Sequence, residues 1–80
     1  MRTQEALTWI AEVFEEPAGR ISAETSRNDI PSWDSLGTLT LIAAFDERFD
    51  IHLSEQDING MKRVGDVIEI LRRNGKLTDA

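Results

Sequence analysis

The sequence has no cysteine and a single histidine, His52. Disulfides, thiolate metal sites and histidine clusters are therefore excluded, because each needs at least two such residues. No apolar run approaches the roughly 20 residues that span a bilayer, and Glu5 stands where a signal peptide would be apolar. We expect a cytoplasmic protein without membrane insertion.

Positive charge is also scarce. Nine Lys and Arg residues face fifteen Asp and Glu residues, so the formal net charge is −6 at pH 7. A surface of this sign repels phosphate backbones and anionic lipids, which disfavours nucleic-acid and membrane-surface partners. The acids concentrate in residues 34–60, which hold six of them and one arginine, whereas residues 61–80 hold five bases and three acids. The chain therefore combines an acidic middle with a basic end.

The pattern of apolar residues is helical. Eighty residues, 40% of them hydrophobic, are enough for one small domain and too apolar for a disordered chain. Apolar residues recur at helical spacing over residues 3–16, 35–49 and 64–73, and a short helix fits between Ser54 and Gly60. The sequence predicts an all-α fold over residues 1–80. This fold is a small four-helix bundle with three main helices, one short helix and a long loop between helices 1 and 2.

The helix ends carry their own signals. Thr3 is a candidate N-cap of the first helix, and Pro17 stops that helix at or before Glu16. Ser54, followed by acids, is a candidate N-cap of the short helix, and Gly60 suits its C′ position. The last helix is predicted to bury Val64, Val67, Ile68 and Leu71.

Residues 17–34 show no sustained period and carry two prolines and a glycine. A stretch of this length in so small a domain is typical of a functional loop. Ile21, Ile30 and Trp33 are apolar anchors that can hold it against the helices. We expect an ordered crossover with a short helical turn over residues 22–26.

The second helix has a broad apolar arc. On a helical wheel this arc comprises Leu36, Leu39, Ile42, Ala43, Phe45 and Phe49, with Leu41 and Ala44 outside it. An arc of this width predicts that neighbours pack on more than one side of the helix.

Residues for conventional catalysis or metal binding are missing. A Ser/His/Asp triad would have to combine Ser35, the lone His52 and a nearby acid, without a core large enough for a pocket. A calcium loop starting at Asp46 would place Arg48 and Ile51 where it needs an oxygen ligand and a glycine. No glycine-rich phosphate loop is present. We predict no catalytic residue, no metal ligand and no enzymatic activity.

The junction Trp33-Asp34-Ser35-Leu36 is the remaining candidate site. Asp34 or Ser35 would serve as the N-cap of the second helix, and either stabilises a helix by about 1 kcal/mol. Two capping residues in a row are one more than capping needs. A phosphate ester on Ser35 would lie beside unpaired N–H groups and the positive end of the helix dipole. The spacing permits phosphate attachment at Ser35 but also fits a simple cap.

At this junction the sequence resembles the acyl carrier protein family. The motif is Asp34-Ser35-Leu36, and the match covers essentially the whole chain, in order and at similar lengths. It continues through Leu39, Leu41, Ile42, Phe45 and Phe49, then Asp50-Ile51-His52-Leu53-Ser54-Glu55, the short helix and the final amphipathic helix.

The resemblance implies that Ser35 carries a 4′-phosphopantetheine arm. In that family a separate phosphopantetheinyl transferase supplies the arm from coenzyme A, and its terminal thiol holds cargo as a thioester. Such an arm would bring sulfur to a chain that has no cysteine. The expected partners are this transferase and the enzymes that load and process acyl groups, and we expect a monomer.

The family also suggests how partners recognise the protein. By resemblance, Asp34, Leu36, Asp46 and Glu47 match the acids and apolar contacts that partner enzymes read along the second helix. Other positions depart from the housekeeping fatty-acid carriers, which commonly have acids in place of Gly37 and Thr40, no base in place of Arg48, and a small residue in place of Trp33. These departures indicate a carrier of a specialised biosynthetic pathway.

Two alternatives remain open at this stage. The chain could be an unmodified helical interaction module in which Ser35 is only a cap, or a carrier-like regulatory domain that has lost its arm. In a carrier, an acyl chain could be sheltered by an apolar interior, although the same residues equally form a plain core. That interior comprises Leu7, Ile10, Phe45, Phe49, Val64 and Ile68.

Overall fold

The computed structural model describes residues 1–78. Within them, four α-helices and two short 3₁₀ turns follow in order: α1 (Thr3–Val13), η1 (Ala18–Arg20), η2 (Arg27–Asp29), α2 (Ser35–Phe49), α3 (Glu55–Asn59) and α4 (Val64–Arg73). No strand occurs among the described residues, where the one isolated β-bridge pairs Ser26 with Arg63. The prediction of an all-α bundle with three main helices, one short helix and a long first loop is confirmed.

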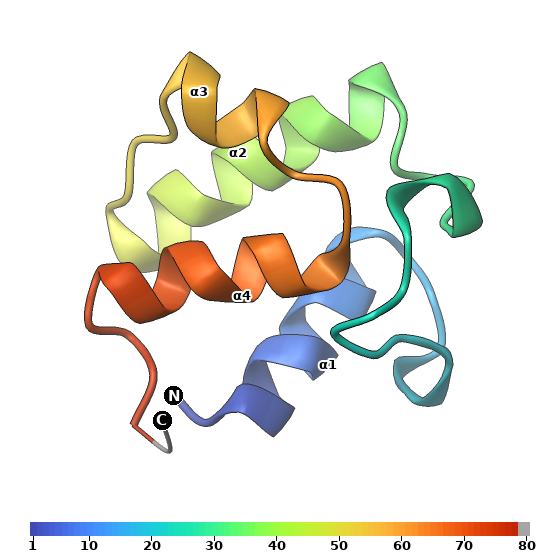
Figure 1. Cartoon of the computed structure of the whole chain (residues 1–80), viewed down its shortest axis with the longest axis horizontal. Helices are drawn as coiled ribbons and strands as arrows, with labels where there is room; N and C mark the ends of the chain where they lie inside the picture. Colours follow the sequence, from blue (N-terminus) through green and yellow to red (C-terminus); the bar gives the residue numbers. More distant parts are fainter. Residues whose placement is uncertain (79–80) are drawn as a thin grey trace.

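The core lies between α1, α2 and α4, and the crossover loop closes one end of it (Figure 1). Trp9 on α1 packs edge-on against two rings of α2, Phe45 at 5.2 Å and Phe49 at 5.0 Å between centroids. At the other end the Thr78 N–H donates to the Met1 carbonyl at 2.9 Å, which ties the tail to the start of α1. No helix in residues 1–78 has both the length and the apolarity to cross a membrane.

The first helix is shorter than predicted, and its N-cap lies one residue earlier. Arg2, not Thr3, is the N-cap, and its N–H donates to the Glu5 carboxylate at 3.0 Å. The helix ends at Val13 because Glu15 adopts a left-handed conformation with φ 57°. This turn carries the chain away from α1 before Pro17, which disfavours helical backbone at the residue before it.

The crossover is ordered, but its helical turns are not where we predicted them. They lie at η1 and η2, on either side of residues 22–26. Residues 22–25 instead form a tight turn in which the Thr25 N–H donates to the Ser22 carbonyl and the Thr25 hydroxyl oxygen accepts from the Ser22 N–H. The side-chain hydroxyl competes with helical bonding here. The anchors were predicted correctly, because Ile21, Ile30 and Trp33 are all buried.

The second helix has the predicted bounds but a different buried face. Leu41, which the wheel placed outside the apolar arc, is fully buried together with Phe45. Leu36 and Leu39 are instead 72% and 63% exposed. The wheel counted apolar residues on the helix alone, whereas burial follows the stripe that faces Trp9 of α1. The prediction of neighbours on more than one side is therefore wrong at Leu36 and Leu39.

The last two helices match their predicted bounds. The Ser54 hydroxyl accepts from the Asp57 N–H at 3.0 Å, and the Asp57 carboxylate accepts from the Ser54 N–H at 3.2 Å, which closes a capping box. Gly60 is the C-cap, in a right-handed conformation (φ −82°), rather than the predicted C′ residue. The buried residues of α4 are the four predicted ones and Ile70.

Candidate functional site

Asp34 is the residue that caps α2. Its carboxylate accepts from the Gly37 N–H at 2.9 Å, and its carbonyl accepts from the Thr38 N–H at 2.8 Å. Ser35 is the first helical residue and is exposed. Within residues 1–78, the Ser35 hydroxyl has no hydrogen-bond partner. The two adjacent capping residues thus separate into one cap and one uncommitted hydroxyl at the positive end of the helix dipole.

Gly37 allows the crossover loop to pass close to this junction. A β-carbon at this position would fall far inside van der Waals contact of the Ser32 carbonyl oxygen, and 3.5 Å from the Phe14 ring. The glycine is therefore required by the close approach of the loop backbone to the first turn of α2. This observation removes Gly37 from the charge comparison with housekeeping carriers, because an acid cannot replace it without moving the loop.

Trp33 anchors the loop immediately before the site. Its indole is 4% exposed and stacks on Phe14, with ring centroids 4.9 Å apart and planes inclined by 23°. The indole N–H is buried and has no hydrogen-bond partner. The predicted burial of Trp33 is confirmed.

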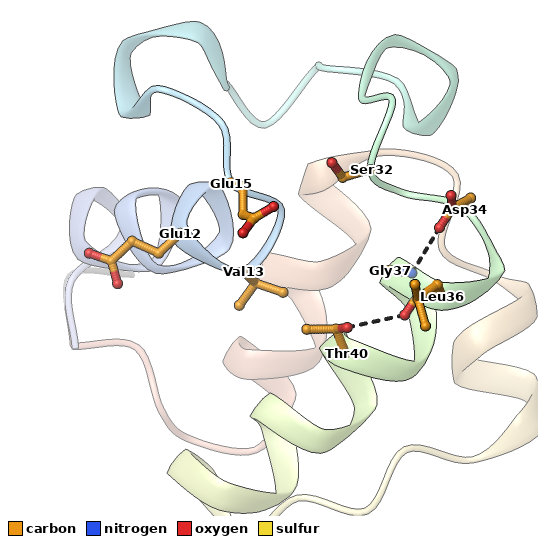
Figure 2. Close-up of a pocket in the computed structure, with 8 residues that line it drawn as sticks. All are labelled: Glu12, Val13, Glu15, Ser32, Asp34, Leu36, Gly37 and Thr40. Carbon is orange, nitrogen blue, oxygen red and sulfur yellow. Dashed lines mark hydrogen bonds between the residues drawn. The ribbon is translucent and has the colours of Figure 1, made fainter.

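A surface hollow of about 490 Å³ lies beside the start of α2. Figure 2 shows its lining, which comes from the end of α1 and the turn after it, the end of the crossover loop and the first turns of α2: Glu12, Val13, Glu15, Ser32, Asp34, Leu36, Gly37 and Thr40. Sequence patterns do not connect Glu12 and Glu15 with the junction, because the crossover loop separates them in the chain. The hollow adds Glu12 and Glu15 to the acidic surroundings of the junction.

The four predicted recognition residues are all exposed. Asp34 and Leu36 lie at the start of α2, and Asp46 and Glu47 lie in its second half. Leu39 extends this surface, and the sequence analysis missed it because its apolar side chain was assigned to the core. Helical spacing places Ser35, Leu39, Ile42 and Asp46 along one stripe. This stripe leads to a second hollow, of about 290 Å³, lined by Leu39, Ile42, Ala43, Asp46, Ile51, His52 and Leu53.

His52 lies at the surface. Its Nδ1 is 3.3 Å from the Asp46 carboxylate and its Nε2 is 3.8 Å from the Asp50 carboxylate. The three side chains offer ligand atoms within 4.8 Å of one another, a grouping that the sequence analysis did not foresee. All three are exposed, and such groups are common without a metal, so we assign no ion to them.

The interior residues that could shelter an acyl chain belong to the packed core. Ile10, Phe45, Val64 and Ile68 are buried, and Leu7 and Phe49 pack against them while partly exposed. Trp9 of α1 packs edge-on against Phe45 and Phe49 of α2. These contacts support the plain-core interpretation of this set.

Comparisons with known proteins identify relatives over most of the chain. No protein-family model matches the chain. The acyl carrier protein of Kineococcus radiotolerans is 29% identical over 69 residues, covering 81% of this chain and 85% of that protein. The acyl carrier protein of Bdellovibrio bacteriovorus is 35% identical over 57 residues, covering 71% of this chain and 73% of that protein.

A solved structure shares the fold. The solution NMR structure of a holo acyl carrier protein from Geobacter metallireducens superposes with a TM-score of 0.75 and 34% identity, over 91% of this chain and 85% of that one. Sequence and fold thus agree over most of the molecule. This chain belongs to the acyl carrier protein family, whose members carry covalent 4′-phosphopantetheine and are carriers rather than enzymes.

Proposed function

We propose that Ser35 carries the 4′-phosphopantetheine arm and that the chain, as a single carrier domain over residues 1–80, holds acyl or related intermediates on it as thioesters. The observation that carries this proposal is that the two adjacent polar residues of the junction have different roles. Asp34 supplies the cap, and the exposed Ser35 hydroxyl is left without a partner within residues 1–78. A phosphodiester there is stabilised by the free N–H groups of the first turn.

The attachment needs coenzyme A and a transferase. The Ser35 oxygen forms a bond to the phosphorus that bears the pantetheine, the pyrophosphate bond of coenzyme A breaks, and the hydroxyl proton passes to a base of the transferase. The nucleotide leaves with the other phosphate. The carrier contributes an accessible hydroxyl and a fixed helix end, and the transferase contributes the chemistry.

The exposed face of α2 is the proposed surface for partner enzymes. Leu36 and Leu39 offer apolar contacts that nothing in residues 1–78 covers. Asp34, Asp46 and Glu47 add negative charge along the same helix. Enzymes that load and process acyl groups would therefore present an apolar contact flanked by Lys or Arg. We place this exchange in the cytoplasm, with the carrier as a monomer.

The pathway is proposed to be specialised rather than housekeeping. Thr40 is exposed on α2, where its hydroxyl donates to the Leu36 carbonyl at 3.1 Å, so a different side chain could be accommodated there. It supplies no charge to a basic partner. Arg48 lies over the Phe49 ring and shares a hollow with Glu5 and Glu12 of α1, so it bears less on the α2 face than its sequence position suggested. The charge argument therefore rests mainly on Thr40.

Intact-mass analysis tests the attachment. The protein is incubated with coenzyme A and a broad-specificity phosphopantetheinyl transferase, and we expect one arm, mapped to Ser35 by peptide fragmentation. Ser35→Ala is expected to stay folded and unmodified because Asp34 still caps α2. Ser32→Ala, which alters the crossover-loop serine three residues earlier, is the matched control and should be modified like the wild type.

The alternative is an unmodified interaction or regulatory module with the same fold. It predicts that the folded wild type accepts no arm from any transferase tested. It also predicts that protein purified from its native host has the mass of the bare chain. Modification of Ser35→Ala would instead show that another residue is the acceptor.

A further inference from the structure

Arg27, on η2, links the crossover loop to the first turn of α2. Its Nε donates to the Trp33 carbonyl at 3.4 Å, and its Nη2 donates to the Thr38 hydroxyl oxygen at 3.3 Å. The guanidinium also lies over the Trp33 ring, with Cζ 5.8 Å from the centroid. These three contacts reach residues on both sides of Ser35.

The contacts continue to the cap of α2. The Thr38 hydroxyl, which accepts from Arg27, donates to the Asp34 carbonyl at 2.9 Å. The Asp34 carboxylate in turn accepts from the Gly37 N–H. The backbone of Arg27 is also fixed, because its main-chain N–H donates to the Lys62 carbonyl at 2.9 Å. Arg27 thus connects the loop before α4, through its backbone N–H, with the residues that flank Ser35, through its half-buried guanidinium.

An arginine is suited to this position. Its planar group presents donors in a fixed fork and stacks on an aromatic face at the same time. Lysine can keep the stacking or one hydrogen bond, but it cannot bridge the Trp33 carbonyl and the Thr38 hydroxyl in the same geometry. Sequence reasoning passed over Arg27 because it lies in the loop without a period.

We propose that Arg27 is a positioning residue that holds the Trp33–Thr38 segment, and with it Ser35, in the geometry that the phosphopantetheinyl transferase binds. This inference rests on the proposed attachment at Ser35. When a flexible segment must adopt one geometry to be bound, the apparent affinity falls with the fraction of molecules in that geometry. Arg27 keeps that fraction high without touching the reacting atoms.

The test compares Arg27→Gln, Arg27→Lys and the wild type in two measurements. The first is amide hydrogen exchange by NMR at Gly37 and Thr38, whose N–H groups are held by Asp34. The second is the initial rate of Ser35 modification against carrier concentration, with coenzyme A saturating. Arg73→Gln is the matched control, because it removes an exposed ion pair with Asp57 on α3, away from the junction.

We expect Arg27→Gln to exchange Gly37 and Thr38 about three- to tenfold faster, the range for losing one or two hydrogen bonds. The KM for the carrier should rise about two- to fivefold, with kcat unchanged within a factor of two, because binding and not chemistry is affected. Arg27→Lys should fall between Arg27→Gln and the wild type. Arg73→Gln should leave both measurements at their wild-type values.

Each outcome supports or overturns the positioning role of Arg27. Faster exchange with an unchanged KM would make Arg27 purely structural and overturn the positioning role, as would unchanged exchange. If Arg73→Gln raised KM as much as Arg27→Gln, general destabilisation would account for the effect and the proposal would fail. These results leave the attachment at Ser35 standing. If the wild type accepts no arm, the attachment fails and the positioning role falls with it.

Discussion

At the scale of single residues, the site is defined by close contacts rather than by charge. Gly37 permits the loop backbone to approach α2, and the Trp33 side chain fills the space beneath the loop. Asp34 caps α2, so the Ser35 hydroxyl is not needed as a cap. Each role depends on side-chain size or hydrogen-bonding capacity. Substitutions at these positions should therefore change stability before they change recognition.

Gly37→Ala is predicted to destabilise the protein, although alanine favours a helix by about 1 kcal/mol over glycine. The new methyl group would overlap the Ser32 carbonyl, and forced repacking of this kind costs about 1–3 kcal/mol. Urea denaturation measures the difference. Gly19→Ala is the control, because a β-carbon there meets nothing within 4 Å. A Gly37→Ala variant about 1 kcal/mol more stable than wild type, the full helix preference of alanine, would show that the loop yields at no cost.

Trp33→Ala is predicted to cost about 3–5 kcal/mol, the range for truncating a buried tryptophan. A domain of this size has about 3–5 kcal/mol of net stability, so this variant should be largely unfolded. Trp33→Phe should stay folded, because it keeps an aromatic ring over Phe14 and removes a buried N–H that has no partner. Circular dichroism during thermal unfolding compares the variants. A Trp33→Ala variant that melts within a degree or two of wild type would contradict the anchoring role.

At the scale of secondary-structure elements, short helices depend on their caps and on their neighbours. The five residues of α3 are too few for a stable isolated helix. Asp57 serves both needs, since its carboxylate completes the capping box and also accepts from Arg73 of α4 at 3.0 Å. The hydrogen bond from Arg73, with further help from Ser54, lowers the pKa of Asp57 below its usual value.

This pKa shift predicts the acid response of the fold. Because the folded pKa of Asp57 lies below the unfolded one, its stabilisation is fully present above about pH 5 and is lost as the pH falls through the folded pKa. Asp57→Asn should be less stable than wild type by about 1 kcal/mol at neutral pH, and the difference should shrink toward zero in acid. Urea unfolding at several pH values measures it. A difference that stays constant from neutral pH into acid would argue against the ionised carboxylate as its source.

At the scale of the whole molecule, one face of α2 is packed and the other is open. Leu41 and Phe45 face the core, whereas Leu36 and Leu39 are exposed next to Asp34, Asp46 and Glu47. Exposed ion pairs with a partner contribute about 0.2–1 kcal/mol each, so single acids would tune the proposed recognition rather than create it. Thr40 is a position on this face where charge can be changed without moving the backbone.

Thr40→Glu on the phosphopantetheine-bearing protein is predicted to improve its use by a housekeeping malonyl transacylase. An added ion pair should raise kcat/KM about two- to fivefold at moderate salt, and screening should reduce the gain as salt increases. Thr8→Glu on α1 is the matched control, because both threonine hydroxyls donate to the carbonyl four residues earlier. If the wild type already equals the transacylase's own carrier, the specialised pathway is excluded.

Much of the fold could be read from local patterns. Three predictions depend only on interactions within a few residues: the helical periodicity, the Ser54 cap and the bounds of α2 and α4. All three are confirmed. The Asp34-Ser35-Leu36 motif pointed to the candidate site because capping and exposure at a helix start are local properties. Two predicted boundaries were wrong. At the start of α1, the Glu5 carboxylate accepts from the Arg2 N–H and makes Arg2 rather than Thr3 the N-cap. At residues 22–26, the Thr25 hydroxyl competes with helical hydrogen bonding.

The sequence by itself thus determined the helices, the family resemblance and the candidate serine, because these depend on neighbours along the chain. The tertiary structure alone decided which face of α2 is buried, since that depends on where Trp9 of α1 lies. It also decided that the Ser32 carbonyl approaches too closely for any residue but glycine at position 37, and that the Arg27 guanidinium donates to the Thr38 hydroxyl. Those contacts join segments that the crossover loop brings together, and periodicity along one helix carries no information about what stands opposite it.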